Sequence, residues 1–154
     1  MKDQHQLSPK EYIKTKARKL PIFACYINEN WKEDGMAIIY VIRKHTVEKY
    51  TFGIYIVDLF ALGTKDCYCR FSNDKQQLDD LLYKGDKHIM HEVDYVLVHN
   101  IIYGANAFAE DHGFKISKEF ELAQYMLEED TEDIELMEIE FGKDGKPLLI
   151  VKGD

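Results

Sequence analysis

The sequence predicts an α+β protein in which a mainly antiparallel sheet packs against a long central helix and two or three shorter helices. Three observations favour this class. The expected helices and strands are segregated along the chain, two apolar runs rich in β-branched residues lie at 36–42 and 50–60, and an almost wholly apolar helical pattern spans 88–112. A length of 154 residues without a linker or repeat indicates one domain, 1–154, with 1–7 expected to be flexible.

The composition is typical of a cytoplasmic protein. Hydrophobic residues make up 45% of the chain, which is enough to fill a core. The sequence has no apolar run near the roughly 20 residues of a membrane span and no signal-peptide pattern at its start. Three cysteines are too few for a disulfide framework, so Cys25, Cys67 and Cys69 are expected to be ordinary strand residues in a reducing compartment.

The first expected element is a helix with a basic outer face. Ser8 and Glu11 form a capping box around Pro9, which favours a helix start, and Pro21 ends the pattern. The outer face carries basic side chains at helical spacing, namely Lys10, Lys14 and Arg18. Such a stripe is usually a solvated helix face, and its alternative is a contact to nucleic-acid phosphates. The formal net charge of −8 argues against general nucleic-acid binding.

Strands are expected next. The segment 22–27 predicts a short strand, and the runs 36–42 and 50–60 predict a buried pair joined by the polar segment 43–49. A further strand is expected at 67–71.

Two carboxylates border the second buried run. Asp58 lies at its end, and Asp66 follows beyond the turn at Gly63. Converging carboxylates are the ligands that Mg²⁺ uses in nucleases and phosphohydrolases, and a third ligand would come from Glu92, Asp94 or Glu110. Carboxylates beside turns are more commonly turn formers or helix caps.

Two helices are expected in the middle of the chain. A short one opens at Ser72 or Asn73 and ends at Gly85. A long one spans 88–112. Because glycine weakens a helix interior, Gly104 suggests a place where another backbone packs closely.

One side of the long helix carries polar and aromatic side chains at steps of three or four residues, namely His91, Tyr95, His99, Tyr103, Asn106 and Glu110. A stripe of rings with polar tips suits a wet cleft or a partner surface, although such residues are more often half-buried boundary residues. At 1.5 Å per residue His91 and His99 lie about 12 Å apart, so they cannot share one metal ion.

The last part of the chain predicts a helix opening at Ser117, a strand at 134–141 and a terminal strand at 147–151. Residues 119–140 contain ten Asp or Glu and no Lys or Arg. Such a stretch is usually a solvated face, and its functional alternative is a surface that attracts a basic partner.

Three segments together resemble a group of small uncharacterised bacterial proteins. They are IYIVDLFALGTKD at 54–66, HNIIYGANAFAEDHGF at 99–114 and FGKDGKP at 141–147. The resemblance implies a free-standing bacterial cytoplasmic protein, and it brings no activity with it.

The leading hypothesis is a non-catalytic binding or regulatory module that contacts another protein, without a cofactor and without a membrane. Its candidate contacts are the acidic stretch and the stripe from His91 to Glu110. The first alternative is a Mg²⁺-dependent nuclease or phosphohydrolase with Asp58 and Asp66 as catalytic residues. The second is a nucleic-acid-binding protein that uses the basic helix.

Overall fold

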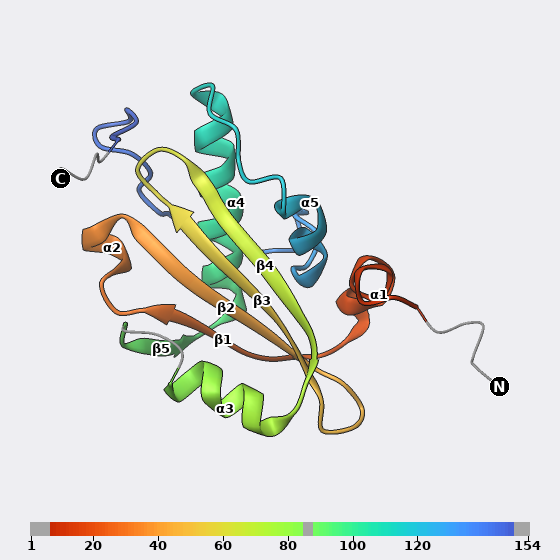
Figure 1. Ribbon diagram of the computed structural model, residues 1–154. Helices are drawn as coiled ribbons and strands as arrows, with labels where there is room; N and C mark the ends of the chain where they lie inside the picture. Colours follow the sequence, from red (N-terminus) through yellow and green to blue (C-terminus); the bar gives the residue numbers. More distant parts are fainter. Residues whose placement is uncertain (1–6, 85–87, 150–154) are drawn as a thin grey trace.

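A computed structural model describes residues 7–84 and 88–149. Figure 1 shows the elements found within these residues, with bounds as follows: α1 (Pro9–Lys16), the 3₁₀-helix η1 (Ala17–Lys19), β1 (Ile22–Asn28), α2 (Trp31–Asp34), β2 (Met36–Lys44), β3 (Tyr50–Asp58), β4 (Gly63–Asn73), α3 (Lys75–Tyr83), β5 (Met90–Val93), α4 (Tyr95–Asp111), α5 (Phe120–Ala123) and the 3₁₀-helix η2 (Gln124–Met126). The expectations for 1–6, for Gly85 and for 150–151 lie outside the described residues.

The five strands form one antiparallel sheet in the order β4-β3-β2-β1-β5. β2 and β3 pair along their length, from Met36 opposite Asp58 to Lys44 opposite Tyr50. Both strands lie inside the sheet, as predicted from runs that are apolar on both faces. The α+β class and the antiparallel sheet are therefore confirmed.

Helices cover both faces of this sheet (Figure 1). α4 packs on one face, where Val98 and Ile101 share a core with Ile39 of β2. α3 packs on the opposite face, where Leu78 contacts a second cluster that includes Phe52 of β3. Side chains alternate along each strand, so consecutive residues of β2 and β3 contribute to the two cores in turn.

The long helix is shorter than predicted. It begins at Tyr95, because residues 90–93 form β5, which pairs with β1 at the edge of the sheet. Backbone pairing with β1 at the sheet edge takes the place of the first two turns of the predicted helix. The predicted end is confirmed, since Gly113 follows α4 with a φ of 85°.

The C-terminal strands predicted at 134–141 and 147–151 are wrong for the part of them that is described. Residues 128–149, here called the strap, contain no helix or strand beyond a bridge between Lys143 and Lys146 at a tight turn. Their alternation of apolar and acidic residues resembles a strand, but their backbone bonds go to side chains and loops instead. The helix predicted from Ser117 is confirmed only as the single turn α5 followed by η2.

Gly104 marks a close contact, as predicted, but the partner is a ring and not another backbone. A Cβ atom at this position would lie 2.4 Å from the Phe141 ring of the strap. The glycine therefore lets the strap lie directly on α4.

Candidate binding surface

The predicted stripe from His91 to Glu110 is divided between two elements. His91 lies on β5 and is exposed, with its Nε2 atom 3.1 Å from a Glu29 carboxylate oxygen, whereas the other five residues lie on α4. His99 and Asn106 are buried, while Glu110 is exposed. The stripe is thus not one continuous surface.

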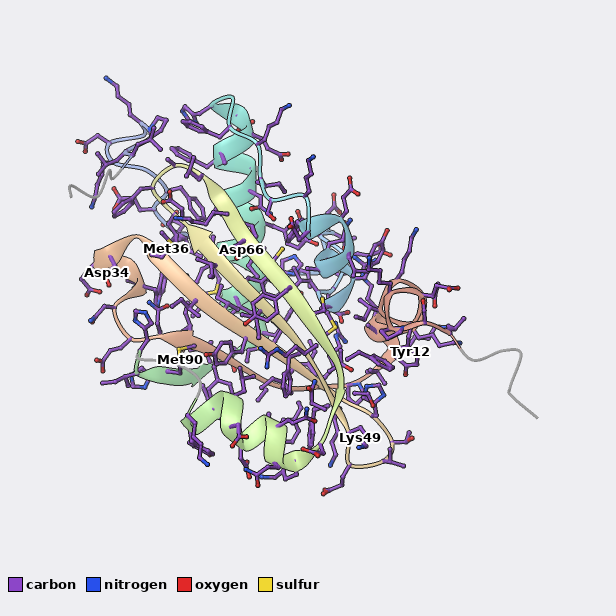
Figure 2. The ribbon with its side chains drawn as sticks, viewed as in Figure 1. Tyr12, Asp34, Met36, Lys49, Asp66 and Met90 are labelled. Carbon is purple, nitrogen blue, oxygen red and sulfur yellow. The ribbon has the colours of Figure 1, made fainter. Side chains whose placement is uncertain are left out.

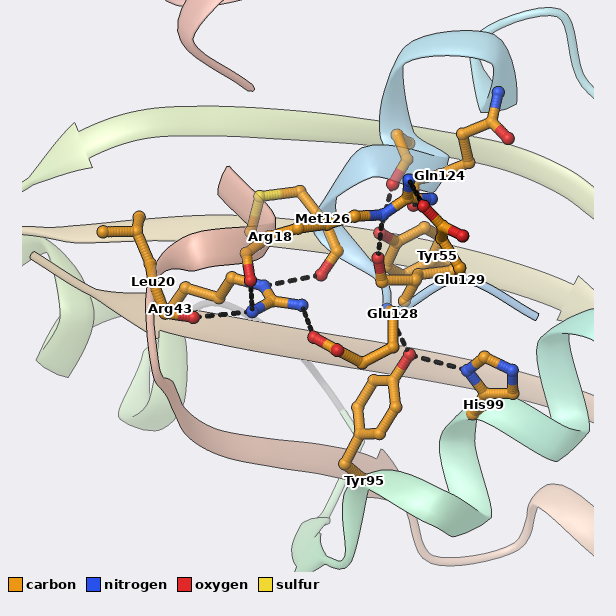
Figure 3. A network of polar contacts seen from close by, with 12 residues as sticks. Arg18, Leu20, Arg43, Tyr55, Tyr95, His99, Gln124, Met126, Glu128 and Glu129 are labelled. Atoms are coloured by element: carbon orange, nitrogen blue, oxygen red, sulfur yellow. Dashed lines mark hydrogen bonds and ion pairs between the residues drawn. The ribbon is translucent and has the colours of Figure 1, made fainter. Parts of the chain in front are cut away.

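Tyr95 and His99 form a hydrogen-bonded chain that ends on the strap (Figure 3). The Glu128 backbone N–H donates to the Tyr95 hydroxyl at 2.7 Å, and that hydroxyl lies 2.7 Å from His99 Nδ1. Nε2 of the same ring lies 3.1 Å from an Asp130 carboxylate oxygen. Because an ionised carboxylate only accepts hydrogen bonds, Nε2 donates to Asp130, and in the neutral ring Nδ1 then accepts from the Tyr95 hydroxyl.

The aromatic members of the stripe also pack on one another. The ring centroids of Tyr95 and His99 are 5.4 Å apart, and those of His99 and Tyr103 are 4.6 Å apart. Burial raises the pKa of both tyrosines, so both remain protonated at neutral pH. Tyr95 and His99 therefore hold the strap, while His99 and Tyr103 line a small pocket of about 280 Å³ between α4 and the strap.

Asn106 has a different partner. Its Oδ1 atom accepts a hydrogen bond from the Thr64 backbone N–H at 2.8 Å, which ties α4 to the start of β4. The Asn106 Nδ2 and Thr64 Oγ1 atoms are buried without a hydrogen-bond partner among the described residues. Asn106 is therefore a packing residue of the core.

Three consecutive acidic residues fasten the strap to the body, and we call Glu128, Glu129 and Asp130 the latch. Glu128 accepts from the buried Arg43 guanidinium at 2.6 Å, and Glu129 lies 3.6 Å from Arg18. Asp130 contacts His99, as described above. Figure 3 shows the contacts of Glu128 and Glu129 with Arg43 of β2 and Arg18 of η1.

Beyond the latch, Asn100 holds the strap as a neighbouring strand would. Its Nδ2 donates to the Glu135 carbonyl at 2.9 Å, and its Oδ1 accepts from the Met137 N–H at 3.0 Å. The strap then returns to the sheet, where Gly142 N–H donates to the Leu59 carbonyl at 2.9 Å. The strap backbone is thus held on α4 and at the loop that follows β3, and Phe141 of the strap packs against the core.

Between residues 132 and 140 the outward side of the strap is acidic, and Leu136 is the most exposed apolar side chain there. Leu136 is 89% exposed. Five carboxylates around it are exposed and have no ion pair with a described residue, namely Glu132, Asp133, Glu135, Glu138 and Glu140. Lys32 and Lys143 line the same small pocket as Glu138 and Glu140 but form no ion pair with them, so the strap presents carboxylates that are not paired with a described cation.

The predicted pair Asp58 and Asp66 lies at the β3–β4 end of the sheet. Asp58 accepts a hydrogen bond from the Phe60 N–H at 2.9 Å, which is the geometry of a turn former. Asp66 lies on β4, where it is exposed and pairs with Ile56 of β3. β4 forms one edge of the sheet, and β5 with Met90 forms the other (Figure 2). Within residues 7–84 and 88–149, no group of three His, Cys, Asp or Glu side chains is placed to hold a metal ion.

The predicted basic stripe does not remain intact. Lys10 and Lys14 are exposed, but Arg18 is turned toward the body, where its Nε donates to the Leu127 carbonyl at 2.8 Å and its guanidinium lies over the Tyr125 ring. One of the three cations is thus already engaged.

The sequence reasoning missed Arg43 and Asn100, two residues that position the strap. Asn100 is a polar side chain inside the apolar α4, and Arg43 directly follows the apolar run 36–42 as the first residue of the polar segment 43–49. A polar residue in such a place is a signal for a buried hydrogen-bonding role, because an unpaired polar group there is costly.

Comparisons with family models, curated proteins and solved structures find no match to this chain. The described helices include none that is long and apolar enough to cross a membrane. The function must therefore be argued from the geometry alone.

Proposed function

We propose that this protein is a non-catalytic binding module that contacts a basic partner protein through the strap. The observation that carries the proposal is the set of exposed carboxylates at 132–140, which form no ion pair with a described residue and lie on either side of the exposed Leu136 in the sequence. A surface of one charge sign steers an oppositely charged partner, and an exposed apolar side chain supplies contact area.

The way the strap is held supports this role. The latch and Asn100 fix its backbone, so a partner meets an ordered surface and the ordering cost of binding is lower. The three free cysteines and the resemblance noted above fit a role in the bacterial cytoplasm, which we include in the proposal.

Charge-neutralising variants test the proposal. The strap variant carries Glu132→Gln, Asp133→Asn, Glu138→Gln and Glu140→Gln. The control variant neutralises the same number of exposed carboxylates elsewhere, Glu33→Gln, Asp34→Asn, Glu110→Gln and Asp111→Asn. A third variant, Leu136→Ser, removes the apolar side chain without a change of charge.

Tagged forms of each variant are used to purify partners from cells, and the captured proteins are quantified by mass spectrometry. We expect one or more basic proteins to be captured by the wild type and the control variant and to be lost from the strap variant and from Leu136→Ser. Equal capture by the strap and control variants would refute the proposal.

A further inference from the structure

A groove lies where β5, the first turn of α4 and the strap meet. It has a volume of about 720 Å³ and is lined by Glu92, Val93, Asp94, Val96, Leu97, Glu135 and Met137. It runs beside β5, the terminal strand of the sheet. An extended segment of another protein can add to a sheet at such a strand.

The floor of the groove is apolar. Val93, Val96 and Leu97 are half-buried, and Met137 is 42% exposed. Methionine adapts its shape to different apolar groups, which suits a contact surface. This apolar floor favours a ligand that has apolar side chains of its own.

The rim of the groove is acidic. Glu92, Asp94 and Glu135 are exposed, and none has an ion pair with a described residue. Asp94 occupies the N-cap position of α4, yet its side chain makes no capping hydrogen bond. Among the described residues, no Lys or Arg lines the groove. Its rim therefore complements cations.

We propose that this groove binds an extended segment of a partner protein in which Lys or Arg side chains alternate with apolar ones. The period of two of an extended chain places apolar side chains on the Val96 and Met137 floor and basic side chains toward the Glu92 and Glu135 rim. This inference rests on the proposed function and deepens it, since it names the docking site and the chemistry of the segment.

The test uses a fluorescein-labelled peptide of about 12 residues that alternates lysine with leucine, and measures its binding by fluorescence anisotropy at low salt. A lysine–serine peptide and a glutamate–leucine peptide are the matched probes. The groove variant carries Glu92→Gln, Asp94→Asn and Glu135→Gln, and a three-site control carries Glu33→Gln, Asp34→Asn and Glu110→Gln. Circular dichroism verifies that each variant is folded.

We expect the lysine–leucine peptide to bind the wild type at least about tenfold more tightly than it binds the groove variant, with the three-site control close to the wild type. The two matched probes should bind more weakly than lysine–leucine. The groove would be refuted as the binding site if the peptide bound the groove variant as tightly as the wild type. Equal losses of affinity in the groove variant and the three-site control would also refute it.

Two further outcomes separate the groove from the proposed function. If only the strap variant loses the peptide, the groove is refuted and the strap contact stands. If no basic peptide binds the wild type, the groove is refuted, and the capture experiment decides the proposed function by itself. A dimer in sedimentation that dissociates in the groove variant would place a second copy in the groove and also overturn this proposal.

Discussion

At the scale of single residues, Arg43 is the buried cation that joins the sheet to the strap. Its side chain is only 1% exposed. It donates to the Leu20 carbonyl at 2.6 Å and to the Met126 carbonyl at 2.9 Å, as well as to Glu128. A buried cation is tolerated when its donors are bonded in this way, and removing it leaves the acceptors unpaired.

We therefore expect Arg43→Ala to lower the free energy of unfolding by about 3 kcal/mol. Arg43→Met, which keeps most of the volume, should also destabilise because the carbonyls still lose their donor. The measurement is urea unfolding followed by circular dichroism. The control Arg70→Ala removes an exposed arginine of β4 and should change the value by less than about 0.5 kcal/mol. Similar losses for Arg43→Ala and Arg70→Ala would contradict the role of Arg43.

The three cysteines make the free energy of unfolding depend on pH. Burial raises the pKa of Cys25, Cys67 and Cys69 to about 12. In the unfolded chain a thiol ionises near pH 8.5, so between that pH and about 12 unfolding releases protons. The free energy of unfolding should thus fall as the pH rises through this range, by up to about 1.4 kcal/mol per pH unit for each thiol.

Urea unfolding at pH 8 and pH 10 checks this expectation. A triple Cys→Ala variant serves as the comparison, because its tyrosines and lysines titrate as in the wild type. Its stability should fall less steeply between the two pH values. If both proteins show the same slope, the thiols do not ionise on unfolding as proposed.

At the scale of elements, hydrophobic periodicity was sufficient for much of the fold. It predicted the buried strands β2 and β3 and the end of α4, because these segments owe their structure to apolar burial. β5 was missed, because its four residues form a strand only through pairing with β1, and Asn28 and Cys25 are remote in sequence from Met90 and Val93.

The candidate site was predicted less well for the same reason. The acidic stretch was recognised from composition, but its conformation depends on single polar contacts, such as those of Asn100, that no period encodes. The stripe on α4 has the predicted spacing, yet the strap covers Tyr95 and His99, so spacing alone did not show which face was free.

Because the strap packs directly on α4, one substitution is expected to change the free energy of unfolding in the direction opposite to the usual one. An alanine in a helix interior is normally favoured over glycine by about 1 kcal/mol. Gly104→Ala should instead destabilise, because its Cβ would meet the Phe141 ring at 2.4 Å. In a Phe141→Ala background the same substitution should stabilise.

A double-mutant cycle with urea unfolding measures this coupling. We expect Gly104→Ala to lower the free energy of unfolding in the wild type and to raise it by up to about 1 kcal/mol when Phe141 is absent. A stabilising effect in both backgrounds would show that the strap does not rest on Gly104.

At the scale of the whole molecule, the protein combines a sheet held between helices with a strap that has little backbone pairing of its own. β2 and β3 lie inside the sheet and are covered on both faces, so their opening requires loss of the two cores. The strap is held by the latch, by Asn100 and by a few backbone hydrogen bonds to the loop between β3 and β4. Stability should therefore be lowest in the strap, which is also the segment proposed to meet the partner.

Brief digestion of the native protein with a glutamyl endopeptidase checks this distribution. Proteases bind several residues in extended form, and the strap offers such a length of exposed chain around Glu132, Glu135 and Glu138. Exposed glutamates outside helices and strands also occur at Glu29, Glu48 and Glu119. The loop at Glu48 is short and closed by a hydrogen bond from His45 N–H to the Lys49 carbonyl at 2.9 Å. We expect the first cuts in the strap, located by mass spectrometry.

Removal of Asn100 should loosen the strap selectively. Asn100→Ala deletes both side-chain bonds to the Glu135 and Met137 backbone, so the strap should open more often and cleavage there should accelerate about tenfold, the factor expected for a loss of about 1.4 kcal/mol. The control Asn30→Ala removes an exposed amide that makes no capping bond to α2 and should leave the rate unchanged. First cuts at Glu33 or Glu48, or equal rates in the two variants, would mean that the strap is as firmly held as the sheet. A partner would then meet it as a rigid part of the body.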